Sequence, residues 1–402
     1  MLIQTLAIFV DAYRELNAKK LFWLTLLLSG VVVLAIAALG IGPEGVKIII
    51  WNIDIPGINS RTFPPEVFYK TVFANLGIDI WLTWVASILA LISVASLFPD
   101  FLSSGSIELT LSKPIGRLRL FGTKYVAGLL FVTLQVLVFT GACFLVIGIR
   151  GRTWEPGLFW SVPIVVCFFS YLYAMCVLVG LLTRSTIASL LITLLFWLFL
   201  FLLNTGDMIT LQIREFQGER ISAIESRIQR MEGTARENLW KQKFDAEHPA
   251  DEANPGAEAP PVAPAVPEDF RPVKEELDKG NPFLPGRRAD LEKARKSQRT
   301  VATVNRWFFV AKTIFPKTAE TVKLLERKLI SAADLKNMRA EQDEGVNIKM
   351  NDEDERVDQQ RAAERVQGVL RSRSVGWIVG SSLAFEALLL GLTGWLFCRR
   401  DF

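Results

Sequence analysis

The chain is poor in the residues that most often carry catalysis and metal binding. Its 402 residues include one histidine and four cysteines. His248 lies beside a proline-rich stretch, and the cysteines lie inside or at the end of long apolar runs, at Cys143, Cys167, Cys176 and Cys398. The motifs H-E-x-x-H, C-x-x-C and G-x-x-x-x-G-K-[ST] are absent. This leaves no histidine pair for zinc, no disulfide framework outside the apolar runs and no usual loop for ATP phosphates. We therefore expect no enzyme, and no metal or cofactor bound by this chain.

Apolar sequence is what the chain has in excess. Hydrophobic residues make up 51% of it, Phe and Trp number 27 and 11, and the mean hydropathy is +0.32. Six runs carry the excess, the last broken only by Glu386: 21–41, 80–98, 125–149, 157–183, 187–203 and 375–398. A helix rises about 1.5 Å per residue and the hydrocarbon layer is about 30 Å thick, so each run is near the length needed to cross. Helices of a soluble core would show apolar stripes, whereas these runs are apolar on every face. We expect an all-α polytopic membrane protein with six transmembrane helices.

The first run has a second interpretation as a secretory signal. Lys19 and Lys20 precede it, and Ala35 to Ala37 resemble a cleavage site. Its apolar core is longer than that of a typical signal, which favours an uncleaved span.

Lysine and arginine in the short loops predict the orientation, because they concentrate on the cytoplasmic side. With the N-terminus placed inside, ten lie in the cytoplasm: Arg14, Lys19, Lys20, Lys113, Arg117, Arg119, Lys124, Arg184, Arg399 and Arg400. Five lie outside: Lys47, Arg61, Lys70, Arg150 and Arg152. We therefore predict cytoplasmic N- and C-termini, with Arg150 and Arg152 as the dissenting pair.

Residues 204–374, between the last two runs, then form an extracytoplasmic insert that we expect to be mainly helical. Its acidic and basic residues nearly balance, so it is not a nucleic-acid-binding surface. A stripe at helical spacing predicts a helix continuing outward from the fifth span with a coiled-coil-like face: Ile221, Ile224, Ile228 and Met231. Residues 249–286 hold nine of the 18 prolines, which predicts a disordered linker. Further helices are expected over 287–315 and 354–373.

Three shorter segments complete the organisation. Residues 1–20 read as an amphipathic helix lying on lipid at the cytoplasmic surface. The first outer loop, 42–79, holds a β-rich patch, "VKIIIWNIDI", and a short helix around "PPEVFYKTVFANLG". The stretch 307–315, "WFFVAKTIF", has two interpretations that the sequence leaves open, one at the membrane surface and one as the apolar face of a soluble helix.

Glu386 lies halfway along the sixth run, and a carboxylate there is costly. Insertion scales place a central acidic residue at about 2.5–3.5 kcal/mol, while each Leu, Ile, Phe or Val returns about 0.3–0.6 kcal/mol. Such a group faces a bundle interior or an aqueous path, and we take Glu386 as a candidate for the transport pathway. The competing interpretation is structural, a protonated Glu386 that hydrogen-bonds across helices to Gln135 or Tyr171.

The cytoplasmic segment 99–124 is longer and more broken than a plain positive loop requires. A short helix candidate, Ile107 to Lys113, is ended by Pro114, and "IGRLRLFGTKY" follows. This stretch, "GSIELTLSKPIGRLRLFGTKYVAGLLF", resembles the one after the second span in permease subunits of type-2 ABC transporters. Matching positions are Gly105, Ile107, Glu108, Leu111, Ser112, Lys113, Pro114, Ile115, Arg117 and Lys124. The departures are Ser106, Thr110 and an inserted Thr123.

Three other stretches resemble the same family: "DAYRELNAKKLFW" before the first run, "FPKTAET" at Phe315 to Thr321 and the C-terminal "FCRRDF". The resemblance covers Met1 to Asn204 and Trp377 to Phe402, and covers the proline-rich insert poorly. It implies a permease that pairs with a second copy or homologue and with separate ABC ATPase subunits, which bind ATP and Mg. It also implies that the loop after span two touches the ATPase. The coupling residues would then be Glu108, Lys113, Pro114, Arg117 and Arg119.

The sequence thus favours a transport subunit in a bacterial inner membrane, with export the expected direction. A non-transporting scaffold that binds an extracytoplasmic protein through the insert is the main alternative. A secondary transporter in which Glu386 carries protons is a third, weakened by the lack of other intramembrane charges or of an internal repeat.

Overall fold

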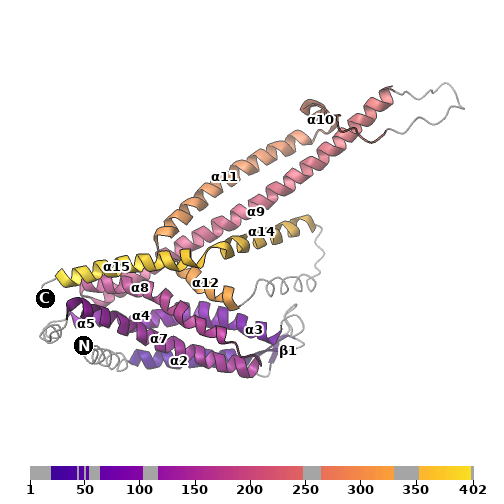
Figure 1. The fold of residues 1–402 in the computed structure, drawn as a ribbon. Helices are drawn as coiled ribbons and strands as arrows, with labels where there is room; N and C mark the ends of the chain where they lie inside the picture. Colours follow the sequence, from indigo (N-terminus) through magenta and orange to yellow (C-terminus); the bar gives the residue numbers. More distant parts are fainter. Residues whose placement is uncertain are drawn as a thin grey trace. The chain divides into compact units, whose positions relative to one another are not determined.

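The computed structural model describes residues 20–42, 45–48, 51–53, 64–102, 116–247, 264–329 and 353–399. The predicted helix at the N-terminus therefore lies outside the described residues, except for Lys20. Residues 103–115 of the coupling segment and the linker prolines from Pro249 to Pro261 also lie outside the described residues. Where it is described, the chain is mainly helical with one small sheet (Figure 1).

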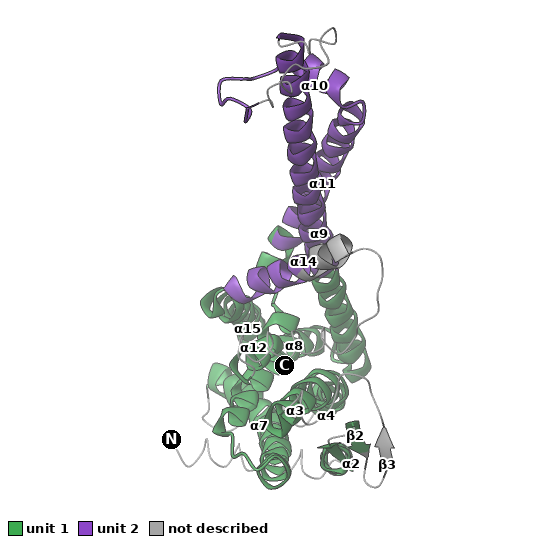
Figure 2. Cartoon of the chain, turned by 90° about the vertical axis from the view of Figure 1, so that its right-hand side faces the viewer, with its two compact units in different colours: residues 1–205, 310–349, 373–402 green, residues 206–309, 350–372 purple. Residues whose placement is uncertain are grey.

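The chain forms two compact units, coloured separately in Figure 2. Unit 1 comprises residues 1–205, 310–349 and 373–402, and unit 2 comprises 206–309 and 350–372. Residues 310–329, which lie within the predicted insert 204–374, therefore cluster with the apolar helices of unit 1.

Among the described residues, six helical stretches are long and apolar enough to cross a membrane. Each overlaps one of the predicted runs: Lys20–Ala38, Pro65–Phe101, Arg117–Arg150, Pro156–Thr183, Thr186–Glu247 and Gly376–Arg399. A helix satisfies its own backbone hydrogen bonds, as a segment in hydrocarbon must. The chain thus has the composition and secondary structure of a membrane protein.

These stretches are built from several elements. The first is α2 (Lys20–Ala38), and the second joins α3 (Pro65–Val72), the π-helix η1 (Phe73–Ala86), α4 (Ser87–Ala95) and α5 (Leu97–Phe101). The third is α7 (Arg117–Arg150), and the fourth joins the 3₁₀-helix η2 (Pro156–Trp160) to α8 (Ser161–Thr183). The fifth is the start of α9 (Thr186–Glu247), and the sixth joins the π-helix η3 (Gly376–Gly380) to α15 (Ser381–Arg399).

The boundaries follow from local chemistry. Pro65 begins α3 in the first turn, where its missing N–H is not needed. Between α8 and α9 the chain turns within two residues, and Arg184 adopts a left-handed φ of 53° to make this possible.

Helix α8 is central to the core of unit 1. It contacts α7, α15, α4 and α12 (Thr318–Leu329), and Phe168, Phe169, Leu172 and Tyr173 are fully buried on it. The apolar residues of α12, Val322, Leu325 and Leu329, join the same core. This packing is why the segment after α11 belongs to unit 1, although it lies within the predicted insert.

The predicted β-rich patch contributes two strands, β2 (Gly45–Ile48) and β3 (Trp51–Ile53), to a three-stranded antiparallel sheet. The first strand, β1 (Leu39–Gly42), contains the last residues of the first predicted apolar run, which was expected to be helical to residue 41. Arg150 donates from Nη2 to the Leu39 carbonyl at 3.1 Å and from Nε to the Tyr69 hydroxyl at 3.3 Å. The Tyr69 hydroxyl donates to the same carbonyl at 2.9 Å. One of the two dissenting arginines of the charge count therefore ties β1, α3 and α7 together.

Unit 2 contains an antiparallel pair of helices, the later part of α9 and the early part of α11 (Leu284–Ile314). Its small core contains Ile228, Ala235 and Leu284, with Ile224 and Met231 packed against it. The predicted apolar stripe of the insert is therefore confirmed as a packing face. Polar pairs between α9 and α11 include Glu225 with Arg295 and Glu232 with Arg288, each at 2.6 Å. Arg365 of α14 (Glu353–Ser372) pairs with Glu219.

Part of the predicted linker, residues 249–286, is helical. Residues 274–280 form the helix α10 (Lys274–Gly280), and α11 begins at Leu284. Glu276 lies in the first turn of α10 and accepts a hydrogen bond from the Val273 N–H, which caps the helix. The proline content of the segment, on which the linker prediction was based, gives no indication of this helix.

The stretch 307–315 corresponds to the end of α11. Trp307 is 71% exposed and Ile314 is 64% exposed, whereas Lys312 between them is only 5% exposed. Phe315, the last residue of the stretch, packs against Phe196 and Phe385. The apolar side chains of the stretch therefore do not share one face, and both interpretations stay open.

Candidate functional site

The first candidate site is the base of the coupling segment. Glu108, Lys113 and Pro114 lie outside the described residues, whereas Arg117 and Arg119 occupy the first turn of α7. Arg117 is half-buried and donates from Nη1 to the Cys398 carbonyl at 3.2 Å, and Arg119 is exposed. Cys398 lies in the last turn of α15, where carbonyl groups have no hydrogen-bond partner within the helix. The Arg117 guanidinium supplies that partner, and its positive charge is favourable at a helix C-terminus. The start of α7 is therefore bonded to the end of the sixth apolar stretch.

An aromatic cluster strengthens this link. Phe101 at the end of α5 lies 6.2 Å from Phe397 of α15, measured between ring centroids. Phe121 of α7 lies 5.9 Å from Phe397 and 5.4 Å from Phe98. Lys124 lies over the Phe101 ring at 4.9 Å. The described residues on either side of 103–115 thus include rings that pack on Phe397 of α15.

The second candidate site is Glu386 on α15, which is 7% exposed. Its Oε1 accepts a hydrogen bond from the Tyr125 hydroxyl of α7 at 2.8 Å, and its Oε2 contacts the Ser170 hydroxyl of α8 at 2.7 Å. The predicted cross-helix bonding of Glu386 is present, but the expected partners Gln135 and Tyr171 were wrong. Tyr171 instead contacts the Cys167 thiol at 3.0 Å.

Gln135 lines a different part of the bundle. It borders a cavity of about 10 Å³ together with Thr25, Ser29 and Ser87, and its Nε2 is buried without a hydrogen-bond partner. A volume of this size holds about one water molecule. Gln135 therefore borders a small, mainly apolar pocket and does not belong to the Glu386 site.

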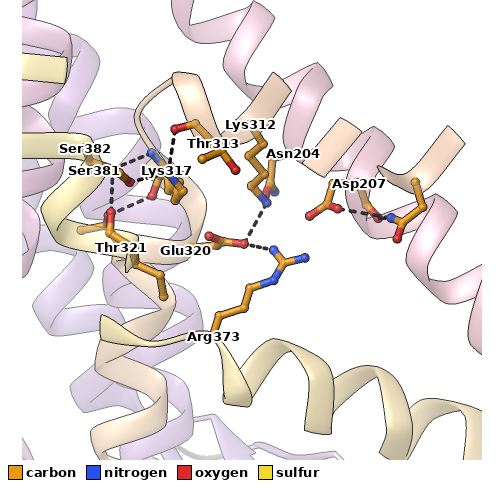
Figure 3. Close-up of polar contacts among 12 residues, drawn as sticks. Asn204, Asp207, Lys312, Thr313, Lys317, Glu320, Thr321, Arg373, Ser381 and Ser382 are labelled. Carbon is orange, nitrogen blue, oxygen red and sulfur yellow. Dashed lines mark hydrogen bonds and ion pairs between the residues drawn. The ribbon is translucent and has the colours of Figure 1, made fainter. Parts of the chain in front are cut away.

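A third group, which sequence reasoning did not find, is a buried ionic cluster in unit 1. Glu320 of α12 lies between Lys312 and Arg373 (Figure 3). Lys312 Nζ is 2.9 Å from Glu320 Oε1 and donates to Asn204 Oδ1 at 2.6 Å. The side chains of Lys312, Glu320 and Arg373 are 7%, 5% and 9% exposed. The cluster joins the three segments of unit 1, which are far apart in the sequence.

Lys317 lies beside this cluster and is only 1% exposed. Its Nζ donates to Ser381 Oγ at 2.5 Å and to the Thr313 carbonyl at 3.4 Å, and it lies 4.2 Å from the centre of the Trp377 ring. Burial lowers the pKa of the Lys317 ammonium to about 8, with Lys312 and Arg373 adding to the shift and Glu320 opposing it. In the part of the chain that the structure describes, no carboxylate forms an ion pair with Lys317.

The sequence held only a weak signal for this group. Lys312 and Lys317 interrupt an apolar stretch, and "FPKTAET" was noted for its resemblance alone. The partners Glu320 and Arg373 lie 53 residues apart, so no local spacing brings them together.

The described residues contain no group of three or more His, Cys, Asp or Glu side chains placed to hold a metal ion. Comparison with known proteins finds no matching family model, no matching curated protein and no matching solved structure.

Proposed function

We propose that this chain is the membrane-spanning permease subunit of an ABC exporter. In this role it couples ATP hydrolysis by a separate ATPase subunit, which binds ATP and Mg, to movement of a substrate across a bacterial inner membrane. A second copy or a homologue completes the pathway, and both termini face the cytoplasm. The observation that carries the proposal is the segment Gly105 to Lys124, with its resemblance to the ATPase-contacting loop of type-2 permeases and its attachment to α15.

The attachment provides a mechanical route. A partner that moves residues 103–115 would displace Phe101 on one side and Phe121 on the other. Both rings pack near Phe397, and Arg117 is bonded to the same end of α15. Tightly packed side chains transmit displacement because an interior without voids cannot absorb it locally. Motion at the segment would therefore reach the helix that carries Glu386.

Lipid is the expected surrounding of the apolar stretches. Large apolar side chains point away from the protein on several of them, including Leu27 of α2, Ile149 of α7, Ile187 of α9 and Leu388 of α15, at 64%, 71%, 79% and 71% exposure. Exposed apolar area on this scale is a liability in water and is matched by a hydrocarbon phase.

The test combines purification with a coupling variant. Tagged protein extracted in mild detergent should recover an ATP-binding-cassette subunit. Exchanging Glu108 and Arg117 for Gln together should leave the complex assembled but uncouple its ATPase activity from transport. A matched control, Glu275→Gln with Arg152→Gln, makes the same charge changes at two exposed positions outside the segment and should leave coupling intact. Repeated recovery without any ATPase would refute the proposal.

A scaffold function remains the second candidate, because unit 2 offers a specific feature. The residues just before α10 and α11 include exposed apolar side chains, with Val273 64% and Phe283 73% exposed. A scaffold would retain an extracytoplasmic partner through this unit without any ATPase. The same purification decides between the two functions.

A further inference from the structure

The buried face of α15 is unusual in its composition. Its buried residues are Ser382, Glu386, Thr393, Gly394 and Phe397. Several large apolar side chains of the same helix are exposed, among them Leu388 at 71% and Trp395 at 53%, whereas Phe397 is fully buried. A helix whose polar groups face inward and whose apolar groups face outward lines a polar interior in a membrane bundle. Glu386 lies within this inward polar stripe.

The Ser170 hydroxyl lies between two hydrogen-bond acceptors. Its Oγ lies 2.7 Å from Glu386 Oε2 and 2.8 Å from the carbonyl oxygen of Cys167, one turn earlier in α8. Both neighbours can accept a hydrogen bond, but a hydroxyl has one hydrogen and two lone pairs. The hydroxyl hydrogen can therefore point to only one of the two oxygens at a time.

The two positions of that hydrogen correspond to the two charge states of Glu386. When the carboxylate is ionised, Ser170 donates to Oε2 and Tyr125 donates to Oε1. When the carboxyl group is protonated on Oε2, it donates to Ser170 Oγ, and Ser170 donates to the Cys167 carbonyl. Tyr125 still donates to Oε1 at 2.8 Å, or to the Ser170 carbonyl at 3.2 Å. Both states are hydrogen-bonded at both carboxyl oxygens, and exchange between them requires the gain or loss of one proton together with rotation of one hydroxyl.

Among the described residues, the groups that face Glu386 include no lysine or arginine. The titratable groups that face it are Tyr125 of α7 and Cys167 of α8, with Tyr173 of α8 stacked on Tyr125 at 4.9 Å. Within the described ranges, no lysine or arginine forms an ion pair with Glu386. A proton is thus the one positive charge that this site is arranged to accept and release.

We propose that Glu386 is a proton-binding site that gains and loses a proton during the transport cycle, so that substrate movement is accompanied by proton movement. The proton arrives on Oε2 from water on one side of the bundle and leaves to water after the helices rearrange. No other bond is made or broken. This inference rests on the proposed transport role but not on the identity of the ATPase partner, and it adds a second transported species to that role.

The experiment follows the carboxyl group directly. Full-length protein in lipid nanodiscs is titrated while the C=O stretching absorption of protonated carboxyl groups is recorded. We expect one band that titrates reversibly and is lost in Glu386→Gln. In Ser170→Ala the band should shift in frequency and in its midpoint pH, because the carboxyl group loses its alternating partner. Ser189→Ala is the matched control, since it removes another buried serine hydroxyl, which donates to the Thr186 carbonyl of its own helix and bonds with Cys176 but not with Glu386.

A second measurement tests the movement of protons. Vesicles containing the native complex and a trapped pH-sensitive dye should show ATP-dependent proton movement that Glu386→Gln abolishes. A carboxyl band that is present or absent at every pH, and unchanged by Ser170→Ala, would overturn the proton site. If Glu386→Gln does not fold, the shift in Ser170→Ala decides the question. If no ATPase accompanies the protein but the band titrates, the proton site stands and the proposed ABC role fails.

Discussion

Units 1 and 2 contain ion pairs of similar length that differ greatly in burial. In unit 1 the pair Lys312 and Glu320 is 2.9 Å apart, with side chains 7% and 5% exposed. In unit 2 the pair Arg295 and Glu225 is 2.6 Å apart, with side chains 53% and 38% exposed. Distance therefore does not distinguish the two pairs, but burial does. The energetic role of an ion pair depends on the water that it loses, which differs greatly between these units.

The two units also differ in how many large apolar side chains they expose. Unit 1 buries an extensive core and still exposes large aliphatic side chains such as Ile187 and Leu388. Unit 2 has a small core and a surface of charged residues. This is the contrast expected if unit 1 is surrounded by lipid, as proposed, and unit 2 by water. Three substitutions test it, from the largest expected effect to the smallest.

Glu320→Gln should have the largest effect, because it leaves Lys312 and Arg373 buried without this carboxylate. Removing one partner of a buried pair costs about 3–5 kcal/mol of unfolding free energy. The measurement is thermal unfolding in detergent. Glu225→Gln is the matched control in unit 2 and should cost no more than about 1 kcal/mol, since exposed pairs contribute little. Equal losses from the two variants would show that burial is not the difference between the units.

Leu284→Ala should affect unit 2 alone. Leu284 is fully buried in the small core against Ile228 and Ala235, and a buried Leu→Ala change costs about 2–5 kcal/mol. With so few other core contacts, local opening of α9 and α11 should dominate. Hydrogen exchange should therefore speed up in residues 206–309 and stay unchanged in α7 and α8. Val273→Ala, at a position 64% exposed, is the control, and faster exchange in α8 would contradict the independence of the two cores.

Much of this architecture is readable from the sequence because it depends on local patterns. Uniformly apolar runs predict the long helices, and each run overlaps one of them. The stripe from Ile221 to Met231 predicts the packing face of α9, and "VKIIIWNIDI" predicts the sheet. The position of Glu386 in the middle of a helix was equally evident. In each case the signal lies within a few neighbouring residues.

The parts that were missed depend on long-range packing. No separate helix was predicted at residues 318–329, and nothing in the residues of α12 themselves shows that Val322 and Leu325 pack with α8. The partners of Glu386 come from 261 and 216 positions earlier in the chain, so Gln135 and Tyr171 were reasonable but wrong choices. The burial of Lys317 could not be predicted for the same reason, since its contacts Ser381 and Trp377 lie far along the chain.

Lys317→Met should have the smallest effect, and in the opposite direction. The folded-state pKa of about 8 lies below the ordinary value of 10.5, so burying the charged ammonium costs stability at neutral pH. Between these two values the unfolded chain holds more protons than the folded chain, and stability therefore rises with pH across this window. Methionine has a similar volume and no charge, so the variant should be as stable as the parent at pH 7 or more stable by about 1–3 kcal/mol. It should also lose the rise in stability above about pH 8.

Lys328→Met provides the matched control for that prediction. Lys328 also lies over a tryptophan, 3.8 Å from the centre of the Trp160 ring, but its side chain is exposed. A cation over an exposed ring contributes about 0.5–1 kcal/mol, so this variant should be slightly less stable than the parent. Opposite signs for the two variants would show that burial determines whether unit 1 tolerates a lysine beside an aromatic ring. A large loss of stability in Lys317→Met would instead show that its bonds to Ser381 and Thr313 outweigh the cost of burying the charge.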